Sequence, residues 1–181
     1  MRSTLGIAVF VAAAGLTGCA PAVAIHPFYT NHDLVSDLLL PGVWSSNDGQ
    51  IWRVKAVQDG YDVTQTPEPG AAVSGEFNVH LARLDECEFV DVTSKADVGI
   101  GVPGHLIGKV RFEAGKLFVS ALNETWLKHM IETGAGPASI IGESQQLVLT
   151  APTSELQVFL RLHCDDPAAW DEDDEGLQRL H

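Results

Sequence analysis

The chain has 181 residues, and its 24 acidic side chains outnumber its 11 basic ones, which gives a formal net charge of −13 at neutral pH. This excess of negative charge argues against nucleic acid and anionic lipid head groups as partners, because both are negatively charged and repel it. Hydrophobic residues make up 45% of the chain, which is enough for the core of one globular domain.

The first eighteen residues, MRSTLGIAVFVAAAGLTG, have the layout of a secretory signal peptide. Arg2 is followed by a run of mostly apolar and small residues from Leu5 to Leu16. A membrane-spanning helix needs about 20 apolar residues, so this run is too short to remain in the bilayer as a span. We expect residues 1–18 to be removed, which leaves 10 basic and 24 acidic side chains and a net charge of −14.

The four residues Leu16-Thr17-Gly18-Cys19 resemble the lipobox of bacterial lipoproteins, in which a branched aliphatic residue and two small residues precede a cysteine. The resemblance implies cleavage before Cys19 by signal peptidase II, followed by a diacylglycerol and an N-acyl chain on Cys19. It implies the membrane as a partner through this lipid, with no other cofactor. Ala20, in place of the Asp that retains lipoproteins in the inner membrane, implies the periplasmic side of the outer membrane. The alternative is an ordinary cleavage site with a cysteine present by chance.

Two further cysteines, Cys87 and Cys164, remain in the mature chain. An even number of cysteines in an oxidising compartment favours a disulfide. Two buried, unpaired thiols are the alternative, because sequence separation says nothing about distance in space.

The sequence predicts four segments. Residues 1–18 form the signal peptide, residues 19–31 a lipidated tether, and residues 32–165 a single β-rich domain. Residues 166–181 form an acidic tail that we expect to be disordered, because seven carboxylates fall between Asp165 and Glu175.

Alternation of apolar and polar residues, interrupted by short turns, predicts a meander of three hairpins. The expected strands are residues 50–57 and 61–65, then 76–84 and 88–93, then 105–113 and 116–122.

Helical spacing predicts a short N-terminal helix within residues 31–42, and two helices in the C-terminal half. Asn123 is expected to cap the first of these two, over residues 124–133, and Thr153 the second, over 154–163. A strand at residues 146–150 lies between them. The fold class is therefore α+β, with a mainly antiparallel, curled or barrel-like sheet.

The triplet Gly42-Val43-Trp44 resembles the glycine-any-tryptophan signature at the first strand of lipocalins. The resemblance covers these three residues only, and it implies a cup-shaped barrel that binds a small apolar ligand. A helix beginning near Trp126, between strands, departs from the lipocalin order.

Six aromatic residues lie on or beside the expected strands, where they could line an apolar pocket or fill the core. They are Trp44, Trp52, Tyr61, Phe77, Phe89 and Phe112. His80 and His105 lie on strands that could be close in the sheet, where they could hold zinc or copper. The favoured alternative is two polar positions on a sheet face, since neither position implies a ligand by itself. No metal-binding motif is present, because the calcium-loop pattern that begins at Asp171 lacks the glutamate it needs at its last position.

No catalytic motif is found either, so we do not expect an enzyme. The sequence favours a membrane-anchored periplasmic lipoprotein that acts as a noncatalytic structural or partner-binding module, its partner an unknown envelope protein. A carrier or sensor of a small apolar ligand, and an enzyme whose site matches no motif, are the alternatives.

Overall fold

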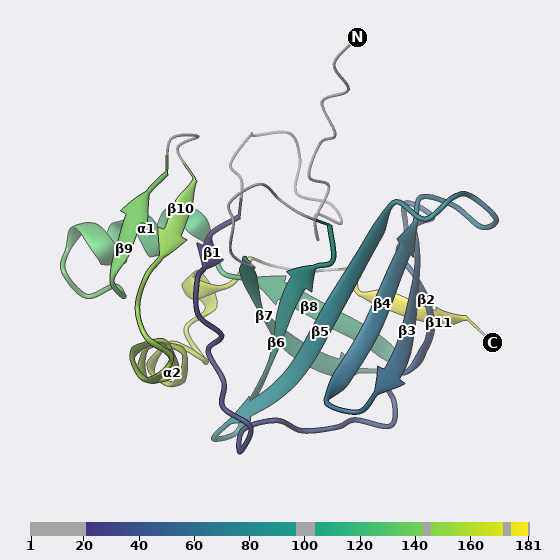
Figure 1. The fold of residues 1–181 in the computed structure, drawn as a ribbon, viewed down its shortest axis with the longest axis horizontal. Coiled ribbons are helices and arrows are strands. Elements are labelled where there is room, and N and C mark those ends of the chain that lie inside the picture. The colour runs from purple at the N-terminus through teal and green to yellow at the C-terminus, as the bar shows by residue number, and fades with distance from the viewer. Residues whose placement is uncertain (1–20, 97–103, 143–145, 172–174, 181) are drawn as a thin grey trace, which may run out of the picture.

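The computed structural model describes residues 21–96, 104–142, 146–171 and 175–180, and an eight-stranded antiparallel β-barrel is its central feature (Figure 1). Seven of the strands follow one another along the chain, each pairs with the next, and the eighth closes the ring. The strands are β2 (Gly42–Ser45), β3 (Ile51–Val57), β4 (Gly60–Thr66), β5 (Gly75–Leu84), β6 (Cys87–Ser94), β7 (His105–Glu113), β8 (Lys116–Ala121) and β11 (Leu177–Leu180). The predicted antiparallel, barrel-like sheet is confirmed.

The closing strand, β11, lies in the segment that we expected to be disordered. It pairs with β2 on one side and with β8 on the other, both antiparallel. Shortly before it, the 3₁₀-helix η1 (Pro167–Ala169) leads to Trp170, whose side chain is only 7% exposed. The expectation of disorder is wrong for the described part of residues 166–181, because β11 supplies the backbone partners that the edges of β2 and β8 would otherwise lack.

Residues 21–31 do not form a tether. β1 (Val23–Ala24) pairs parallel with β10 (Leu147–Leu149), and the side chain of Phe28 is fully buried. The expectation of a tether is wrong for residues 21–31, because their apolar side chains are buried against the outside of the barrel.

The expected helix within residues 31–42 is also absent. Residues 31–33 and 38–39 form turns instead, and the chain between them bonds to β5, with Val35 donating to the Leu81 carbonyl at 2.9 Å and Arg83 donating to the Asp33 carbonyl at 2.9 Å. The pairing of β4 with β5 stops at Tyr61, so the last residues of β5 need another partner, and this segment provides it.

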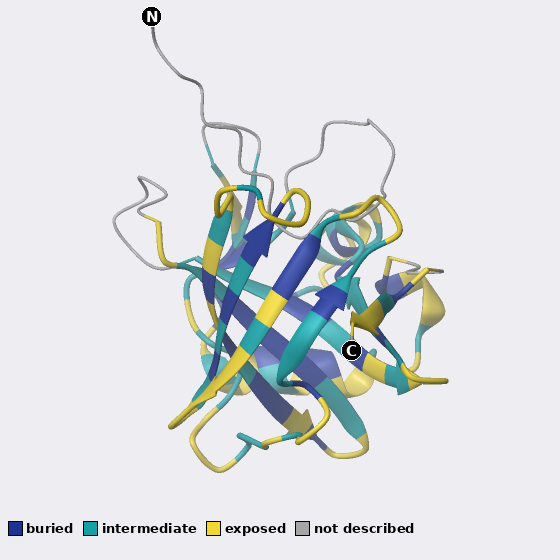
Figure 2. Ribbon diagram, turned by 90° about the vertical axis from the view of Figure 1, so that its right-hand side faces the viewer, coloured by how far each residue is buried: buried dark blue, intermediate teal, exposed yellow. Residues whose placement is uncertain are grey.

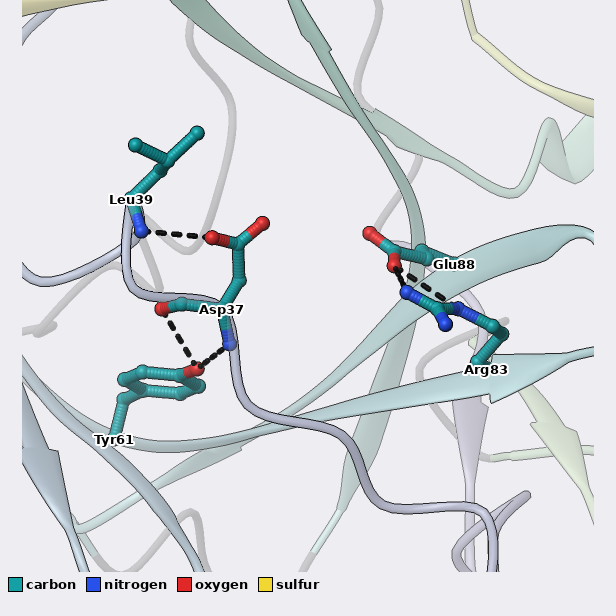
Figure 3. A network of polar contacts seen from close by, with 5 residues as sticks. All are labelled: Asp37, Leu39, Tyr61, Arg83 and Glu88. Atoms are coloured by element: carbon teal, nitrogen blue, oxygen red, sulfur yellow. Dashed lines mark hydrogen bonds and ion pairs between the residues drawn. The ribbon is translucent and has the colours of Figure 1, made fainter.

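Tyr61 forms a hydrogen bond with the C-terminal part of the same segment. The Asp37 amide donates to the Tyr61 hydroxyl at 2.8 Å, and the Leu39 amide donates to the Asp37 carboxylate at 2.7 Å (Figure 3). Nearby, Arg83 donates to Glu88 across the turn between β5 and β6. This second pair is exposed, so it contributes little to stability.

Two helices and a second small group of strands lie outside the barrel. α1 (Glu124–Glu132) begins as predicted, with the Asn123 side chain accepting a hydrogen bond from the Trp126 amide at 2.8 Å. α2 (Thr153–Leu162) begins one residue earlier than expected, and the Thr153 hydroxyl donates to the Pro27 carbonyl instead of capping the helix. Within the described ranges, each helix is too short or too polar to span a bilayer.

β9 (Ser139–Ile141) pairs with β10 and forms the edge of the described sheet. The predicted strand at residues 146–150 is β10, whereas β9 was not predicted. β9 is only three residues long, so its sequence carries no recognisable alternation.

The barrel wall separates two apolar cores. Side chains that point inward form one core, which includes Trp44, Leu81 and Val92. Side chains on the outer face pack against η1, α1 and α2, and they form a second core that includes Phe89 and Leu160. Figure 2 shows the resulting alternation of buried and more exposed positions along the strands. The wall therefore buries apolar residues on both sides where the helices cover it.

Candidate functional site

A pocket of about 450 Å³ lies against the barrel wall, near the turn between β3 and β4. Strands β5, β6 and β7 present polar side chains on their outer face here, and the N-terminal segment runs beside them. The pocket is lined by Tyr29, Val57, Gln58, Asp59, Tyr61, Asn78, Val79, His80, Thr93 and His105. Titratable groups from several elements converge in it.

An aspartate–histidine pair forms the base of this pocket. Asp91 on β6 is fully buried, and both of its carboxylate oxygens lie 2.8 and 2.9 Å from Nδ1 of His105 on β7. The register brings them together, because His105 pairs with Thr93 and Asp91 points to the same face two residues earlier. A buried carboxylate needs such a partner. In the neutral tautomer that donates Nδ1–H to Asp91, Nε2 of His105 is a hydrogen-bond acceptor.

His80 stands beside this pair on β5. It is the cross-strand neighbour of Asp91, and its ring stacks on the ring of Tyr29 with a centroid distance of 5.1 Å. On the other side, a Cβ atom at Gly60 would lie 2.5 Å from the Val79 carbonyl oxygen and 3.1 Å from the His80 ring, so glycine permits the close approach of this turn. Nδ1 of His80 is buried and has no hydrogen-bond partner among the described residues. A bound polar group is one way to satisfy such an atom.

Tyr29 supplies a phenol that stays protonated. Its burial, together with the negative charge of Asp91, raises its pKa from 10.0 to about 12. An unfolded chain therefore releases this proton at a lower pH than the folded protein does, so the contribution of Tyr29 to stability is present below pH 10 and is lost as the pH rises towards 12.

This difference can be measured, because Tyr29 and Tyr61 are the two tyrosines of the chain. In the Tyr61→Phe variant, the ultraviolet absorbance of tyrosinate is expected to appear with a midpoint near the raised pKa of about 12. Adding Asp91→Asn removes the negative charge and should lower this midpoint, although burial still holds it above the value of a free tyrosine. A midpoint at the ordinary tyrosine value before the second substitution would mean that Tyr29 is not buried beside Asp91.

The structure brings His80 and His105 into one pocket, as the strand positions suggested, but among the described residues no group of three potential metal ligands gathers there. Among the described residues, the one group of three potential ligands within 4.8 Å of one another is Cys87, Cys164 and Asp165. Two of these cannot bind a metal as thiolates, because Cys87 and Cys164 form a disulfide with a Cα–Cα distance of 6.5 Å. Of the two alternatives left open by the sequence, the structure therefore has the paired cysteines.

Five of the six aromatic residues considered for an apolar pocket do meet, inside the barrel. Trp44, Trp52, Tyr61 and Phe77 are each 2–3% exposed, and Phe112 packs against them. Phe89 points to the outer core instead. These rings fill the barrel, as expected for eight strands, whose interior is just wide enough to be filled by side chains.

Sequence reasoning missed two members of the site. Asp91 is an acidic residue within an apolar strand, in the stretch FVDVTS, and that contrast is a signal for a buried carboxylate with a specific role. Tyr29 gave no signal, because it lies in a segment without periodicity. Cys19, the predicted lipid attachment site, lies outside the described residues.

Comparisons of the chain with protein-family models, with curated proteins and with solved structures find no significant match. The lipobox and lipocalin resemblances therefore stay predictions, and the site is interpreted from its own geometry.

Proposed function

We propose that this chain is a periplasmic lipoprotein, anchored by lipid on Cys19, whose barrel acts as a noncatalytic binding module. Its outer-wall pocket binds a neutral partner group that is rich in hydroxyls and amides, such as a saccharide unit of an envelope glycan. The observation that carries this proposal is the position of the pocket: the polar groups converge against the wall, whereas the interior of the barrel is packed with aromatic and aliphatic side chains.

The chemistry of the lining favours a neutral ligand. No lysine or arginine is among the residues that line the pocket in the described part of the chain, whereas Asp59 lines it and Asp91 lies buried behind it. An anionic ligand would meet these carboxylates without a fixed cation to balance its charge. Gln58 and Asn78 offer amides, which both donate and accept hydrogen bonds.

Tyr29 and His105 complement each other in this role. The Tyr29 hydroxyl is protonated at neutral pH and can donate, and in the neutral tautomer that donates Nδ1–H to Asp91, Nε2 of His105 is an acceptor. A hydroxyl group of a sugar can satisfy both, because it donates and accepts. The disulfide supports the periplasmic location, since disulfides persist in oxidising compartments.

Titration calorimetry with the neutral trimer of N-acetylglucosamine tests the proposal. Wild-type protein is expected to bind it, and His105→Ala should weaken binding by about tenfold, since one lost hydrogen bond corresponds to roughly 1.4 kcal/mol. The matched control is His129→Ala, because His129 is exposed on α1 and lies outside the pocket lining. Equal affinity of the two variants, or tighter binding of citrate than of the trimer, would contradict this assignment.

The same pair also has the arrangement of a general base, because a buried carboxylate orients an imidazole towards the pocket. A catalytic role is therefore the second candidate. Mass spectrometry of the trimer after incubation distinguishes the two: intact trimer is expected for a binding module, and shorter sugars that disappear with His105→Ala would show hydrolysis.

A further inference from the structure

The predicted lipid attachment site lies very close to the folded barrel. Cys19 is two residues before Pro21, the first residue that the structure describes, so their Cα atoms lie within about 7 Å of each other in any conformation. β1 begins only two residues after Pro21. A lipid on Cys19 would therefore leave no long spacer between the membrane and the domain.

The chain enters the fold beside the hairpin of β9 and β10. The Gln146 side chain donates to the Pro21 carbonyl at 3.3 Å, and Val23 of β1 pairs with Val148 of β10. β9 follows as the next strand and ends the described sheet, as Figure 1 shows. Strands are spaced about 4.8 Å apart, so β9 lies about 10 Å from β1.

At the outer end of these three strands, β9 presents an exposed aliphatic surface. None of their residues is charged, although the chain contains 24 acidic side chains. Ile140 and Ile141 of β9 are 58% and 63% exposed. Ile140 and Val148 are cross-strand neighbours and share one face, whereas Val23, the next residue in this row, is buried. An aliphatic edge of this kind is typical of a contact surface.

We propose that this anchor-proximal edge, defined as Ile140, Ile141 and Val148, rests in the interfacial region of the membrane that holds the lipid of Cys19. The inference rests on the proposed lipid anchor and adds an orientation to it. The distances along the chain and across the strands place the edge within about 20 Å of the anchored Cα atom. An uncharged aliphatic edge is attracted to the bilayer interface by burial of its apolar area, whereas the excess of carboxylates elsewhere keeps the rest of the domain in water.

The orientation can be measured on the full lipidated protein in vesicles of phosphatidylethanolamine and phosphatidylcholine. Because Cys19 carries lipid and Cys87 is paired with Cys164, a newly introduced cysteine is the sole free thiol and accepts one nitroxide label. Ile140→Cys reports on the edge. The matched control is Val158→Cys, which replaces another exposed aliphatic residue, 64% exposed, on α2.

Collisions of the label with oxygen, which concentrates in lipid, are compared with collisions with a water-soluble nickel chelate. The ratio of oxygen to nickel accessibility is expected to be several-fold higher at position 140 than at position 158. Equal ratios would overturn the orientation. So would a label at position 140 that is shielded from both reagents, because a second protein surface would then cover the edge.

Failure of the anchor itself gives a different result. Lipidated protein floats with the vesicles and incorporates radioactive palmitate, and Cys19→Ser should abolish both. Protein that floats and carries palmitate, but has equal accessibility at positions 140 and 158, disproves only the orientation. Protein that carries no palmitate disproves the anchor, and with it the inference.

Discussion

Replacing Gln178 with proline is expected to open the barrel and to lower the free energy of unfolding by about 3 kcal/mol or more. Gln178 lies in β11, where it pairs with Ser45 of β2 and with Lys116 of β8. Proline has no amide hydrogen, so in a strand with neighbours on both sides it removes a hydrogen bond of the sheet. Urea unfolding, followed by tryptophan fluorescence, measures the change.

The matched control is Gln178→Ala. The side chain of Gln178 is exposed, so alanine keeps every backbone hydrogen bond and should change stability by no more than about 0.5 kcal/mol. If the proline and alanine variants proved equally stable, β11 would not be needed to close the barrel.

The hairpins of the barrel could be predicted because their signals are local. The strand predicted from the alternation in residues 105–113 has the same bounds as β7, and the turn at Asp59-Gly60 joins β3 to β4 as expected. Both signals depend on neighbours along the chain, with period two in the strands and glycine in the turns.

The ends of the chain could not be predicted in the same way. β11 is four residues long and follows a run of acidic residues, so composition pointed to disorder. Its stability comes from two strands that precede it by more than fifty residues in sequence. Likewise, the spacing of Leu34, Val35, Leu38 and Leu39 fits a helix. The backbone of this segment instead hydrogen-bonds to the end of β5 that β4 leaves unpaired. Leu38 is consequently 92% exposed. In both cases a distant strand without a partner decided the outcome.

In the candidate site, too, local signals could be predicted from the sequence and contacts between distant segments could not. That His80 and His105 could lie near each other was predicted from their strands, because in a meander their strands, β5 and β7, are separated by β6 alone. The pairing of His105 with Asp91 depends on the register between β6 and β7, which the sequence does not specify. Tyr29 reaches the site from a segment whose course is set by tertiary contacts.

Removal of the disulfide is expected to produce the other large effect. The Cys87→Ala, Cys164→Ala double variant should lose about 4 kcal/mol of stability, because in the chain-entropy model a cross-link over so long a loop strongly restricts the unfolded chain. The two cysteines are 77 positions apart, and the bond joins the start of β6 to the residues just after α2. Urea unfolding of the variant and of wild-type protein measures the difference.

The native structure itself should change little in this variant. Lys109 Nζ donates to the carbonyl oxygen of residue 164 at 2.6 Å, and a substitution of the side chain leaves that hydrogen bond in place. The end of α2 therefore stays attached to β7, and the loss of stability arises mainly from the freer unfolded state. Wild-type protein unfolded with a reductant present should fall to the stability of the double variant, whereas the variant should not respond to the reductant. A wild-type midpoint that is unchanged by reduction would show that the cross-link contributes nothing, and that the contacts of α2 with the barrel hold this side of the protein by themselves.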